Sequence, residues 1–371
     1  MNRPERTTRP ELRPLTAIRG LFAWAVVLYH LRVACRDWLP DVAMQLLAKG
    51  YLAVDFFFLL SGFVIWLNYG ERLRQPGATL DFLVRRIARV WPLHVVMLGF
   101  AAAIALTLLA TGRQANHFPF ALLPLHLAMM QDWGWSNALL WNDPAWSISG
   151  EWGAYLLTPL VVLVLPRRRL STPVLAIAAA TPLLLLFAVL RAGHGGLGYA
   201  ISEFGLLRCL AEFACGTMLS ELWRRWRHDR LIEASCWTAG AAMLVAWWAG
   251  MPETLALPFA LAAILLGLAL GAERPRHLLA GRAIHWLGEI SYATYLSHFL
   301  LFFAFKLAFV RDEYDAPPAG IAAYLLLVLI ASAVLYHGVE RPAQRAILTA
   351  WKRHRDAAGR RAAVTASAAR G

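Results

Sequence analysis

Apolar runs of about twenty residues recur from one end of this 371-residue chain to the other. A run of that length crosses the hydrocarbon core of a bilayer as an α-helix. Only 16% of the residues are charged, whereas a soluble domain carries about 25%. The mean hydropathy is +0.51. The sequence therefore predicts an all-α, polytopic membrane protein whose surroundings are a lipid bilayer.

We expect about ten transmembrane helices. They are predicted at 14–34, 50–69, 90–111, 145–166, 172–190, 199–222, 232–250, 254–272, 284–310 and 319–339. Residues 112–144 contain several prolines and are too broken for a span, so they are interpreted as a re-entrant or interfacial connection. No internal repeat is visible. Residues 1–345 are therefore interpreted as one transmembrane domain, and the basic, alanine-rich tail at 346–371 is predicted to be disordered.

The formal net charge of +13 is explained by the loops and termini on one side of the predicted membrane spans. Of the 36 Lys and Arg residues, 27 fall in the N-terminus, the C-terminal tail and the loops of one side, six fall in the opposite loops, and three lie inside spans. Lys and Arg concentrate on the cytoplasmic side of membrane proteins. Both termini are therefore predicted in the cytoplasm, and no nucleic-acid partner is expected. The four cysteines show no zinc-ligand spacing, so no metal site is predicted.

Ionisable side chains inside the predicted spans are candidates for function, because a charge in the bilayer is costly. Arg19 and His30 lie eleven positions apart on the first span. At about 100° per residue the two side chains share one helix face, and about 16 Å of helix axis separates them. We therefore expect Arg19 near the cytoplasmic surface and His30 deep toward the outer leaflet.

Three further ionisable residues are predicted at the depth of His30. Counting along each span places Asp55 about 8 Å and Glu151 about 9 Å below the outer boundary, and His298 about 21 Å above the cytoplasmic one. In a core of about 30 Å these positions form one layer. Two histidines and two carboxylates at one depth predict a general-base centre, in which Asp55 or Glu151 orients His30 as in a catalytic triad. The alternative is that each group pairs separately and stabilises the helix bundle.

A second candidate cluster is predicted on the cytoplasmic side. Arg86 and Arg89 precede the third span and share a helix face at spacing i, i+3. Guanidinium groups match the geometry of phosphate oxygens, so the pair predicts a phosphate-binding site. The alternative is the ordinary positive charge of a cytoplasmic loop.

Six segments occur in a characteristic order along nearly the whole chain. They are LTAIRGLFAWAVVLYHLR at 15–32, GYLAVDFFFLLSGFVI at 50–65, FLVRRIARVWPLH at 82–94, AWSISGEWGAYLLTP at 145–159, LGEISYATYLSHFLL at 287–301 and VERPAQR at 339–345. In this order they resemble the motifs of the bacterial membrane acyltransferase family 3, including an Arg and a His with ten residues between them and an RxxR element. Each motif alone is weak evidence for the family, whereas all six in this order are strong evidence.

The resemblance implies an O-acyltransferase of the bacterial inner membrane, interpreted here as an O-acetyltransferase. Its acyl group comes from cytoplasmic acyl-CoA, used as a co-substrate such as acetyl-CoA rather than as a bound cofactor. The acceptor is a hydroxyl of a carbohydrate or glycolipid such as exopolysaccharide or lipopolysaccharide. The resemblance supports the following expected roles: His30, Glu151 and Asp55 in catalysis, Arg19, Arg86 and Arg89 in binding of the CoA phosphates, and Ser147, Tyr295 and His298 in substrate binding.

An alternative function is transport of lipid-linked glycans. A transporter would also contain about ten helices and buried charges. It is expected to show repeat symmetry or paired broken helices, and neither is clearly visible in the sequence. A purely structural membrane subunit is a third interpretation, which the six ordered motifs disfavour.

Overall fold

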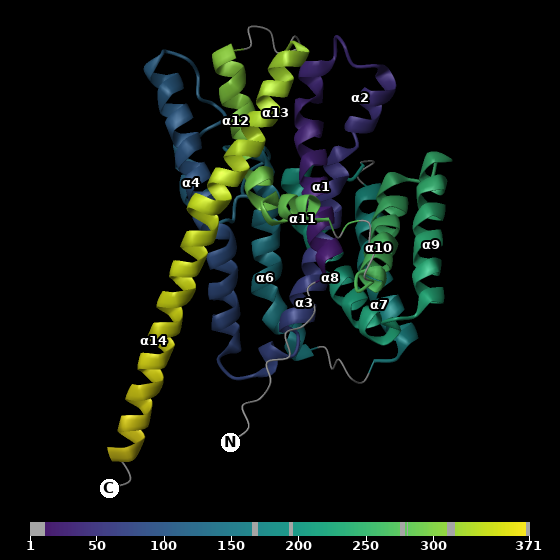
Figure 1. The fold of residues 1–371 in the computed structure, drawn as a ribbon, viewed down its shortest axis with the longest axis vertical. Helices are drawn as coiled ribbons and strands as arrows, with labels where there is room; N and C mark the ends of the chain where they lie inside the picture. The colour runs from purple at the N-terminus through teal and green to yellow at the C-terminus, as the bar shows by residue number, and fades with distance from the viewer. Residues whose placement is uncertain are drawn as a thin grey trace. The chain divides into compact units, whose positions relative to one another are not determined.

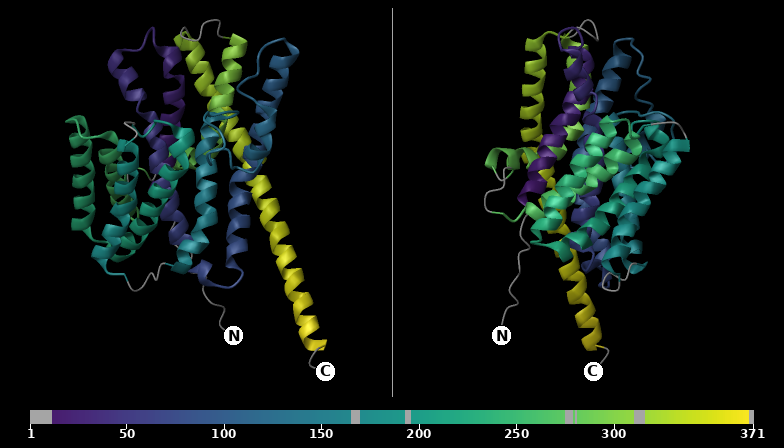
Figure 2. Two further views of the ribbon diagram at one scale, coloured as in Figure 1. Left: turned by 180° about the vertical axis from the view of Figure 1, so that it is seen from behind. Right: turned by 90° about the vertical axis from the view of Figure 1, so that its right-hand side faces the viewer.

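The computed structural model describes residues 12–164, 170–192, 196–274, 279, 281–309 and 316–368. Within these ranges every regular element is a helix (Figure 1 and Figure 2). The prediction of an all-α polytopic protein is therefore confirmed. The arginines before residue 12, those at 167–169 and Arg311, which contribute to the charge asymmetry, lie outside the described residues.

The α-helices follow one another along the chain with short 3₁₀ turns before several of them. They are α1 (Arg13–Leu31), α2 (Asp41–Leu47), α3 (Ala53–Tyr69), α4 (Ala78–Ala110), α5 (Leu123–Leu127), α6 (Trp146–Val164), α7 (Thr172–Ala192), α8 (Ile201–Trp226), α9 (Arg230–Trp248), α10 (Glu253–Gly271), α11 (Arg282–Glu289), α12 (Ser291–Phe309), α13 (Pro318–Leu335) and α14 (Arg341–Ala368).

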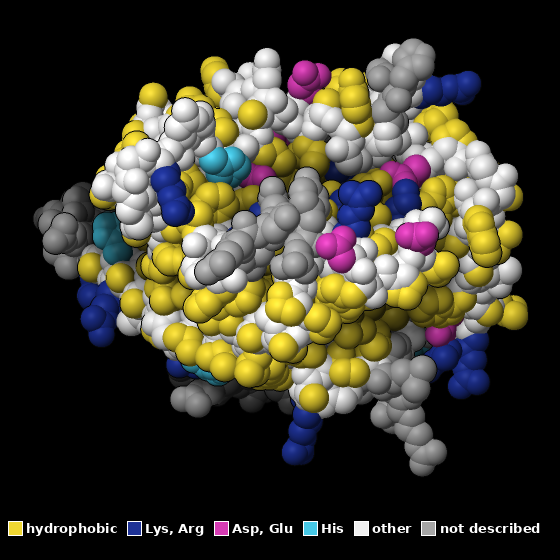
Figure 3. All heavy atoms as spheres, turned by 90° about the horizontal axis from the view of Figure 1, so that it is seen from above, with side chains coloured by type: hydrophobic (Ala, Val, Ile, Leu, Met, Phe, Trp, Pro, Cys, Tyr) yellow, Lys and Arg dark blue, Asp and Glu magenta, His cyan; other side chains and the backbone are white. Residues whose placement is uncertain are grey.

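Nine helical segments in the described part of the chain are long and apolar enough to cross a membrane. They are Arg13–Cys35, Asp41–Tyr69, Ala78–Ala110, Asp143–Val164, Thr172–Ala192, Arg230–Trp248, Glu253–Gly271, Ser291–Phe309 and Pro318–Ala358. Large hydrophobic side chains also stay on the surface: Trp248 is 89% exposed and Phe309 77% exposed. Hydrophobic side chains cover much of the face that Figure 3 shows. Lipid, unlike water, accommodates such a surface.

Helix α8 forms where the sixth span is predicted, at 199–222, but it is more polar than the nine helical segments above. Its charged residues include Arg208, Glu212 and Glu221, and all three are buried. Ionisable groups in a membrane helix face the protein interior and pair there. The low hydropathy of α8 therefore agrees with a helix that is enclosed by protein rather than by lipid.

The chain forms two compact units. The first comprises Met1–Arg32, Leu39–Leu67 and Pro166–Tyr292. In this unit two glycines allow α3 and α8 to approach closely: a Cβ atom at Gly62 would collide with the Phe213 carbonyl oxygen, and one at Gly216 with the Leu59 carbonyl oxygen. Small residues are the usual means by which membrane helices pack backbone to backbone.

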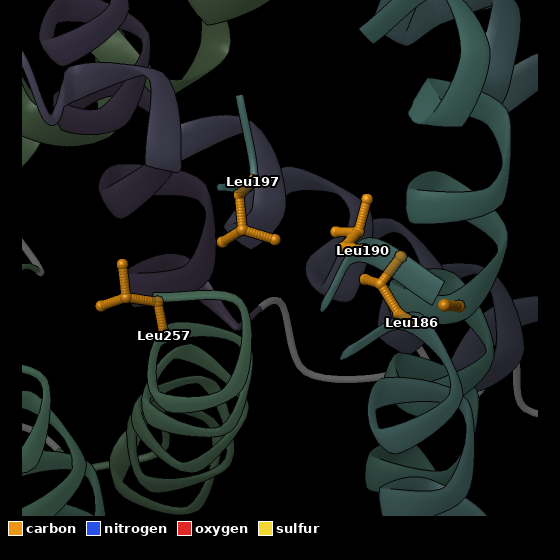
Figure 4. Packing of buried hydrophobic residues seen from close by; sticks show 5 residues of the cluster. Leu186, Leu190, Leu197 and Leu257 are labelled. Atoms are coloured by element: carbon orange, nitrogen blue, oxygen red, sulfur yellow. The ribbon is translucent and has the colours of Figure 1, made fainter. Parts of the chain in front are cut away.

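Leucines from three elements form part of the hydrophobic core of the first unit. Leu186 and Leu190 of α7 pack with Leu257 of α10 and with Leu197, which precedes α8 (Figure 4). Each of these side chains is at most 2% exposed. Burial of a leucine side chain contributes roughly 1.5–3 kcal/mol relative to exposure in water, and less relative to lipid.

The second unit comprises Val33–Trp38, Asn68–Leu165 and Ala293–Gly371. Helix α14 packs along α4 in this unit. Helix α13 continues into α14 through one π-helical turn, Tyr336–Glu340, and Pro342 is the second residue after that turn. Proline lacks the N–H donor of an α-helical hydrogen bond and crowds the preceding turn, and a wider π turn accommodates this defect.

Three elements differ from their predicted bounds. The span predicted at 284–310 consists of two helices, α11 and α12, which meet at Ile290. Helix α4 begins at Ala78 instead of residue 90, so the RxxR element lies within it. The backbone of 346–368 is helical in α14, where the sequence predicts disorder; alanine, lysine and arginine are strong helix formers. The domain boundary at residue 345 stays a prediction.

Candidate active site

Arg19 and His30 lie on the same continuous helix, α1, and both are partly buried. Nδ1 of His30 lies 3.0 Å from the carbonyl oxygen of Val26, one turn earlier. A carbonyl oxygen only accepts, so Nδ1 carries the hydrogen in the neutral ring. The basic nitrogen of a neutral His30 is therefore Nε2. A backbone hydrogen bond that selects the tautomer in this way is a common means of preparing a histidine for proton transfer.

Helix α11 packs against α1 near the Arg19 end of that helix. A Cβ atom at Gly288 would collide with the backbone of Thr16, and one at Gly20 with the backbone of Leu287 and Gly288. The glycines belong to the first and fifth of the six sequence motifs. Their role is therefore close helix packing, which holds the helix that carries Arg19 and His30.

Asp55 forms a buried ion pair with Arg208. Both carboxylate oxygens of Asp55 accept from the guanidinium group, from Nε and from Nη2, each at 2.6 Å. The third contact of Arg208 is Nη1 to the Leu197 carbonyl oxygen at 2.7 Å. Asp55 is fully buried and Arg208 is 2% exposed. The sequence placed Arg208 inside a span but did not identify it as the partner of Asp55.

Three predicted substrate-binding residues lie together in the second unit. The hydroxyl groups of Ser147 and Tyr295 are 2.8 Å apart. Nδ1 of His298 lies 2.7 Å from the carbonyl oxygen of Tyr295, so Nε2 is its basic nitrogen when the ring is neutral. His298 is fully buried. The structure thus unites side chains from α6 and α12 that are 148 residues apart in the sequence.

Glu151 lies four residues after Ser147 on α6 and is partly buried. Residues at this spacing share a helix face. Glu151 therefore belongs to the same side of α6 as the Ser147–Tyr295 pair. The predicted common layer also includes His30 and Asp55, which belong to the first unit, and this layer stays a prediction.

Arg86 and Arg89 share one face of α4 but have different partners. The guanidinium group of Arg86 lies over the Tyr69 ring, 5.2 Å from its centroid, and donates to the Tyr69 hydroxyl at 3.2 Å. Arg89 forms an ion pair with Glu340, which is 1% exposed. The closing motif VERPAQR therefore supplies a carboxylate that binds the second arginine of the RxxR element.

A group of histidines outside the predicted site lies beside the α4–α6 connection. Nε2 of His94 donates to the carbonyl oxygen of His126 at 2.7 Å. Burial lowers the pKa of His126 to about 4, and the nearby His94 and His117 contribute further in the same direction. His126 is therefore neutral at pH 7. No sequence pattern identified His126, because a single histidine in a proline-broken loop matches no motif.

A family model described as an acyltransferase domain matches residues 14–337. The chain belongs to the acyltransferase 3 family. It is a membrane acyltransferase, and the match covers the Arg19 and His30 helix, the RxxR arginines and the Ser147 cluster.

Curated relatives resemble the chain over most of its length. It is 27% identical to "Acyltransferase MdmB" of Streptomyces mycarofaciens, over 92% of this chain and 93% of that protein. It is 28% identical to "Putative membrane-bound transacylase BcsY" of Komagataeibacter xylinus, over 87% of this chain and 81% of that protein. A shorter match, 35% identical over 36% of this chain and 80% of that protein, is to "Protein 2 in picA locus" of Rhizobium radiobacter. No solved structure matches.

Proposed function

We propose that this acyltransferase is an O-acetyltransferase of the bacterial inner membrane, with both termini in the cytoplasm. It transfers the acetyl group of cytoplasmic acetyl-CoA to a hydroxyl of a carbohydrate or glycolipid acceptor such as exopolysaccharide or lipopolysaccharide. The observation that carries the proposal is the 3.0 Å contact between Nδ1 of His30 and the Val26 carbonyl oxygen. The Nδ1–H group donates in this contact, which leaves Nε2 as the nitrogen that takes a proton.

The proposed reaction is a single acyl transfer. Nε2 of His30 removes the proton of the acceptor hydroxyl while the oxygen attacks the thioester carbonyl carbon. The carbon–sulfur bond breaks, CoA leaves as its thiolate, and the proton on His30 passes to that sulfur. The products are an acetyl ester and CoA with a free thiol, and the base returns to its starting state.

The other predicted residues have supporting roles in this proposal. Arg19, Arg86 and Arg89 bind the CoA phosphates, because guanidinium groups donate to phosphate oxygens in matched pairs. Ser147, Tyr295 and His298 bind the acceptor through their hydroxyl and ring nitrogen atoms. Asp55 and Glu151 are the proposed catalytic carboxylates. The bidentate pair with Arg208 fixes the orientation of the Asp55 carboxylate.

The test is transfer of radiolabel from [¹⁴C]acetyl-CoA to glycan extracted from the envelope of the native host, by purified protein in lipid nanodiscs. The His30→Gln variant keeps side-chain size and some hydrogen bonding but takes no proton at neutral pH. We expect it to lose about 10²- to 10⁴-fold of the transfer rate, the typical contribution of a general base. His354→Gln, at an exposed site on α14, is the matched control.

If His30→Gln keeps most of the wild-type rate with both substrates saturating, His30 is not the base. Glu151→Gln then tests the next candidate. If neither variant matters and glycan export is what fails in cells, a lipid-linked glycan transporter replaces the proposal.

A further inference from the structure

One face of α8 contacts α3 through three residues at helical spacing. Arg208, Glu212 and Gly216 follow one another at intervals of four residues, so they lie on the same face of α8. Arg208 binds Asp55 of α3. A Cβ atom at Gly216 would collide with the carbonyl oxygen of Leu59, one turn further along α3. Glu212 lies between these two contacts, so its carboxyl group belongs to the α3–α8 interface within the first unit.

The carboxyl group of Glu212 is enclosed by protein. Glu212 and Asp55 are fully buried, and Arg208 is 2% exposed. Among the described residues, no N–H or O–H group donates to either carboxylate oxygen of Glu212. Its hydrogen-bonding neighbour is the carboxyl group of Asp55. An ionised carboxylate only accepts hydrogen bonds, so a hydrogen bond between two carboxyl groups requires a proton on one of them.

The charges around the two carboxyl groups lead to the same conclusion. One guanidinium group, that of Arg208, faces both of them, and ionisation of both would leave an uncompensated negative charge in the protein interior. Lys49 does not supply the missing positive charge, because it pairs with Glu253 at 2.8 Å. Tyr51 also donates to Glu253. Cys215, the titratable neighbour of Glu212 on α8, carries no positive charge in either of its states.

The contacts of Arg208 decide which carboxyl group carries the proton. Both oxygens of Asp55 accept from the guanidinium group, each at 2.6 Å. Protonation of Asp55 would turn one of these acceptors into a hydroxyl group and weaken a charge-assisted pair. Protonation of Glu212 breaks no hydrogen bond, and its new O–H group can donate to Asp55. The proton therefore belongs on Glu212.

We propose that Glu212 and Asp55 form a buried proton-binding site, in which Glu212 stays protonated at neutral pH and donates a hydrogen bond to the Asp55 carboxylate. The α3–α8 contact is then electrically neutral, with one negative, one positive and one uncharged side chain. Two donors from α8, Arg208 and Glu212, orient the Asp55 carboxylate. The proton site is a property of the folded helix pair, so it stands whether or not Asp55 acts in the proposed reaction.

Infrared spectroscopy tests the proposal directly, because a protonated carboxyl group has a C=O stretching band at higher frequency than carboxylates and peptide groups. The purified protein at neutral pH, in a detergent without ester groups, should show such an acid band, and Glu212→Gln should lack it. Glu340→Gln is the matched control. Glu340 is also buried, but its ion pair with Arg89 keeps it ionised, so the acid band should persist in this variant.

Isotope labelling assigns the acid band to one of the two carboxyl groups. Protein made by cell-free synthesis with glutamate that carries ¹³C in its side-chain carboxyl group should show the band at lower frequency. Aspartate labelled in the same way should leave the band in place. The proposal is overturned if Glu212→Gln and the wild type have the same acid bands, or if labelled aspartate shifts the band and labelled glutamate does not.

Thermal unfolding provides a second measurement. Glu212→Gln keeps the side-chain size and an N–H donor for Asp55, so it should unfold at the wild-type temperature. Glu212→Leu has a similar size but no donor, so it should unfold at a lower temperature. An ionised Glu212 predicts the opposite result, because both substitutions would remove an unpaired buried charge and raise the unfolding temperature. A higher unfolding temperature for Glu212→Gln therefore overturns the proposal, even if Glu212→Leu does not fold.

Neither measurement depends on acyl transfer. Absence of acetyl transfer by the wild-type protein would refute the proposed reaction and leave the proton site intact. Absence of the acid band would refute the proton site and leave the proposed reaction intact.

Discussion

Arg86 and Arg89 belong to one motif, but their side chains have different partners. Arg86 lies within 6.0 Å of the centroids of three aromatic rings, those of Tyr69, Phe82 and Tyr155. Cation–π contacts of this kind orient a guanidinium group without neutralising its charge. Arg89 instead neutralises the buried carboxylate of Glu340. Arg86 is therefore the better candidate for contact with an anionic ligand.

Arg86→Ala should raise the apparent KM for acetyl-CoA at least about tenfold, because a charge-assisted hydrogen bond contributes about 1.5–3 kcal/mol. Arg86→Lys should recover only part of this, since it keeps the charge and loses the planar fork. Arg85→Ala is the control, because Arg85 bonds to Asp81 on its own helix at 2.8 Å. Steady-state kinetics measure all three; equal KM values for Arg85→Ala and Arg86→Ala would contradict the assignment.

The donor role of Arg89 needs a different design. Arg89→Ala alone leaves Glu340 buried without its cation, and loss of one partner of a buried pair destabilises a protein by about 3–5 kcal/mol. Weaker binding of acetyl-CoA by this variant could then result from misfolding rather than from the lost contact. Arg89→Ala combined with Glu340→Gln removes both charges, so it isolates the contribution of Arg89 to acetyl-CoA binding.

The depressed pKa of His126 predicts a pH dependence of stability. Its folded-state pKa is about 4, against about 6.5 in an unfolded chain. The unfolded state therefore binds the proton first as pH falls, and stability is lost between about pH 6.5 and pH 4. The loss approaches about 3 kcal/mol at 1.36 kcal/mol per pKa unit. Thermal unfolding across this range should show a weaker slope for His126→Gln than for His354→Gln.

At the scale of helices, α3 and α8 are joined by more than their apolar faces. Beyond the Asp55–Arg208 pair, Nε1 of Trp66 donates to Glu221 at 2.6 Å and Arg224 donates to the Leu67 carbonyl oxygen at 2.8 Å. These polar contacts require the close backbone approach that Gly62 and Gly216 permit. The polar contacts therefore determine how α3 and α8 align along their axes, and the glycines determine how closely the two helices approach.

Gly62→Ala should weaken this helix pair. The added methyl group would meet the Phe213 carbonyl oxygen, part of a backbone that has no flexible end to move. Overpacking of this kind costs about 1–3 kcal/mol or more. Gly99→Ala on α4 is the control, because its Cβ would meet nothing within 4 Å; it should be neutral or stabilising by up to about 1 kcal/mol. Thermal stability in detergent distinguishes the two, and equal values would contradict the packing argument.

Sequence patterns predicted the helices well and their partners less well. The lengths of the apolar runs were enough to locate α1, α3 and α7, because a membrane span can be predicted from the residues of its own segment. The pairing of Asp55 with Arg208 spans 153 residues, and no local pattern specifies such a contact. The ion pair of Arg89 with Glu340 was missed for the same reason, because 251 residues separate the two.

At the scale of the whole molecule, the charge asymmetry makes a prediction about topology. With 27 Lys and Arg residues on one side and six on the other, both termini should face the cytoplasm. Reporter fusions after Arg311 and after Arg355 should therefore report opposite sides of the membrane. Within the described ranges, the nine apolar helical segments and the polar α8 agree with an even number of spans. A signal from the same side at both fusion sites would contradict the ten-span topology.

The buried charged residues of α8 have a consequence for biogenesis. Arg208, Glu212 and Glu221 would each cost a few kcal/mol on a helix that enters lipid alone. The partners of Arg208 and Glu221, Asp55 and Trp66, lie on α3, which leaves the ribosome about 150 residues earlier. During synthesis α3 must therefore be kept near the insertion machinery, or return to it, until α8 arrives. We therefore expect α8 to become stable in the bilayer only once α3 is beside it.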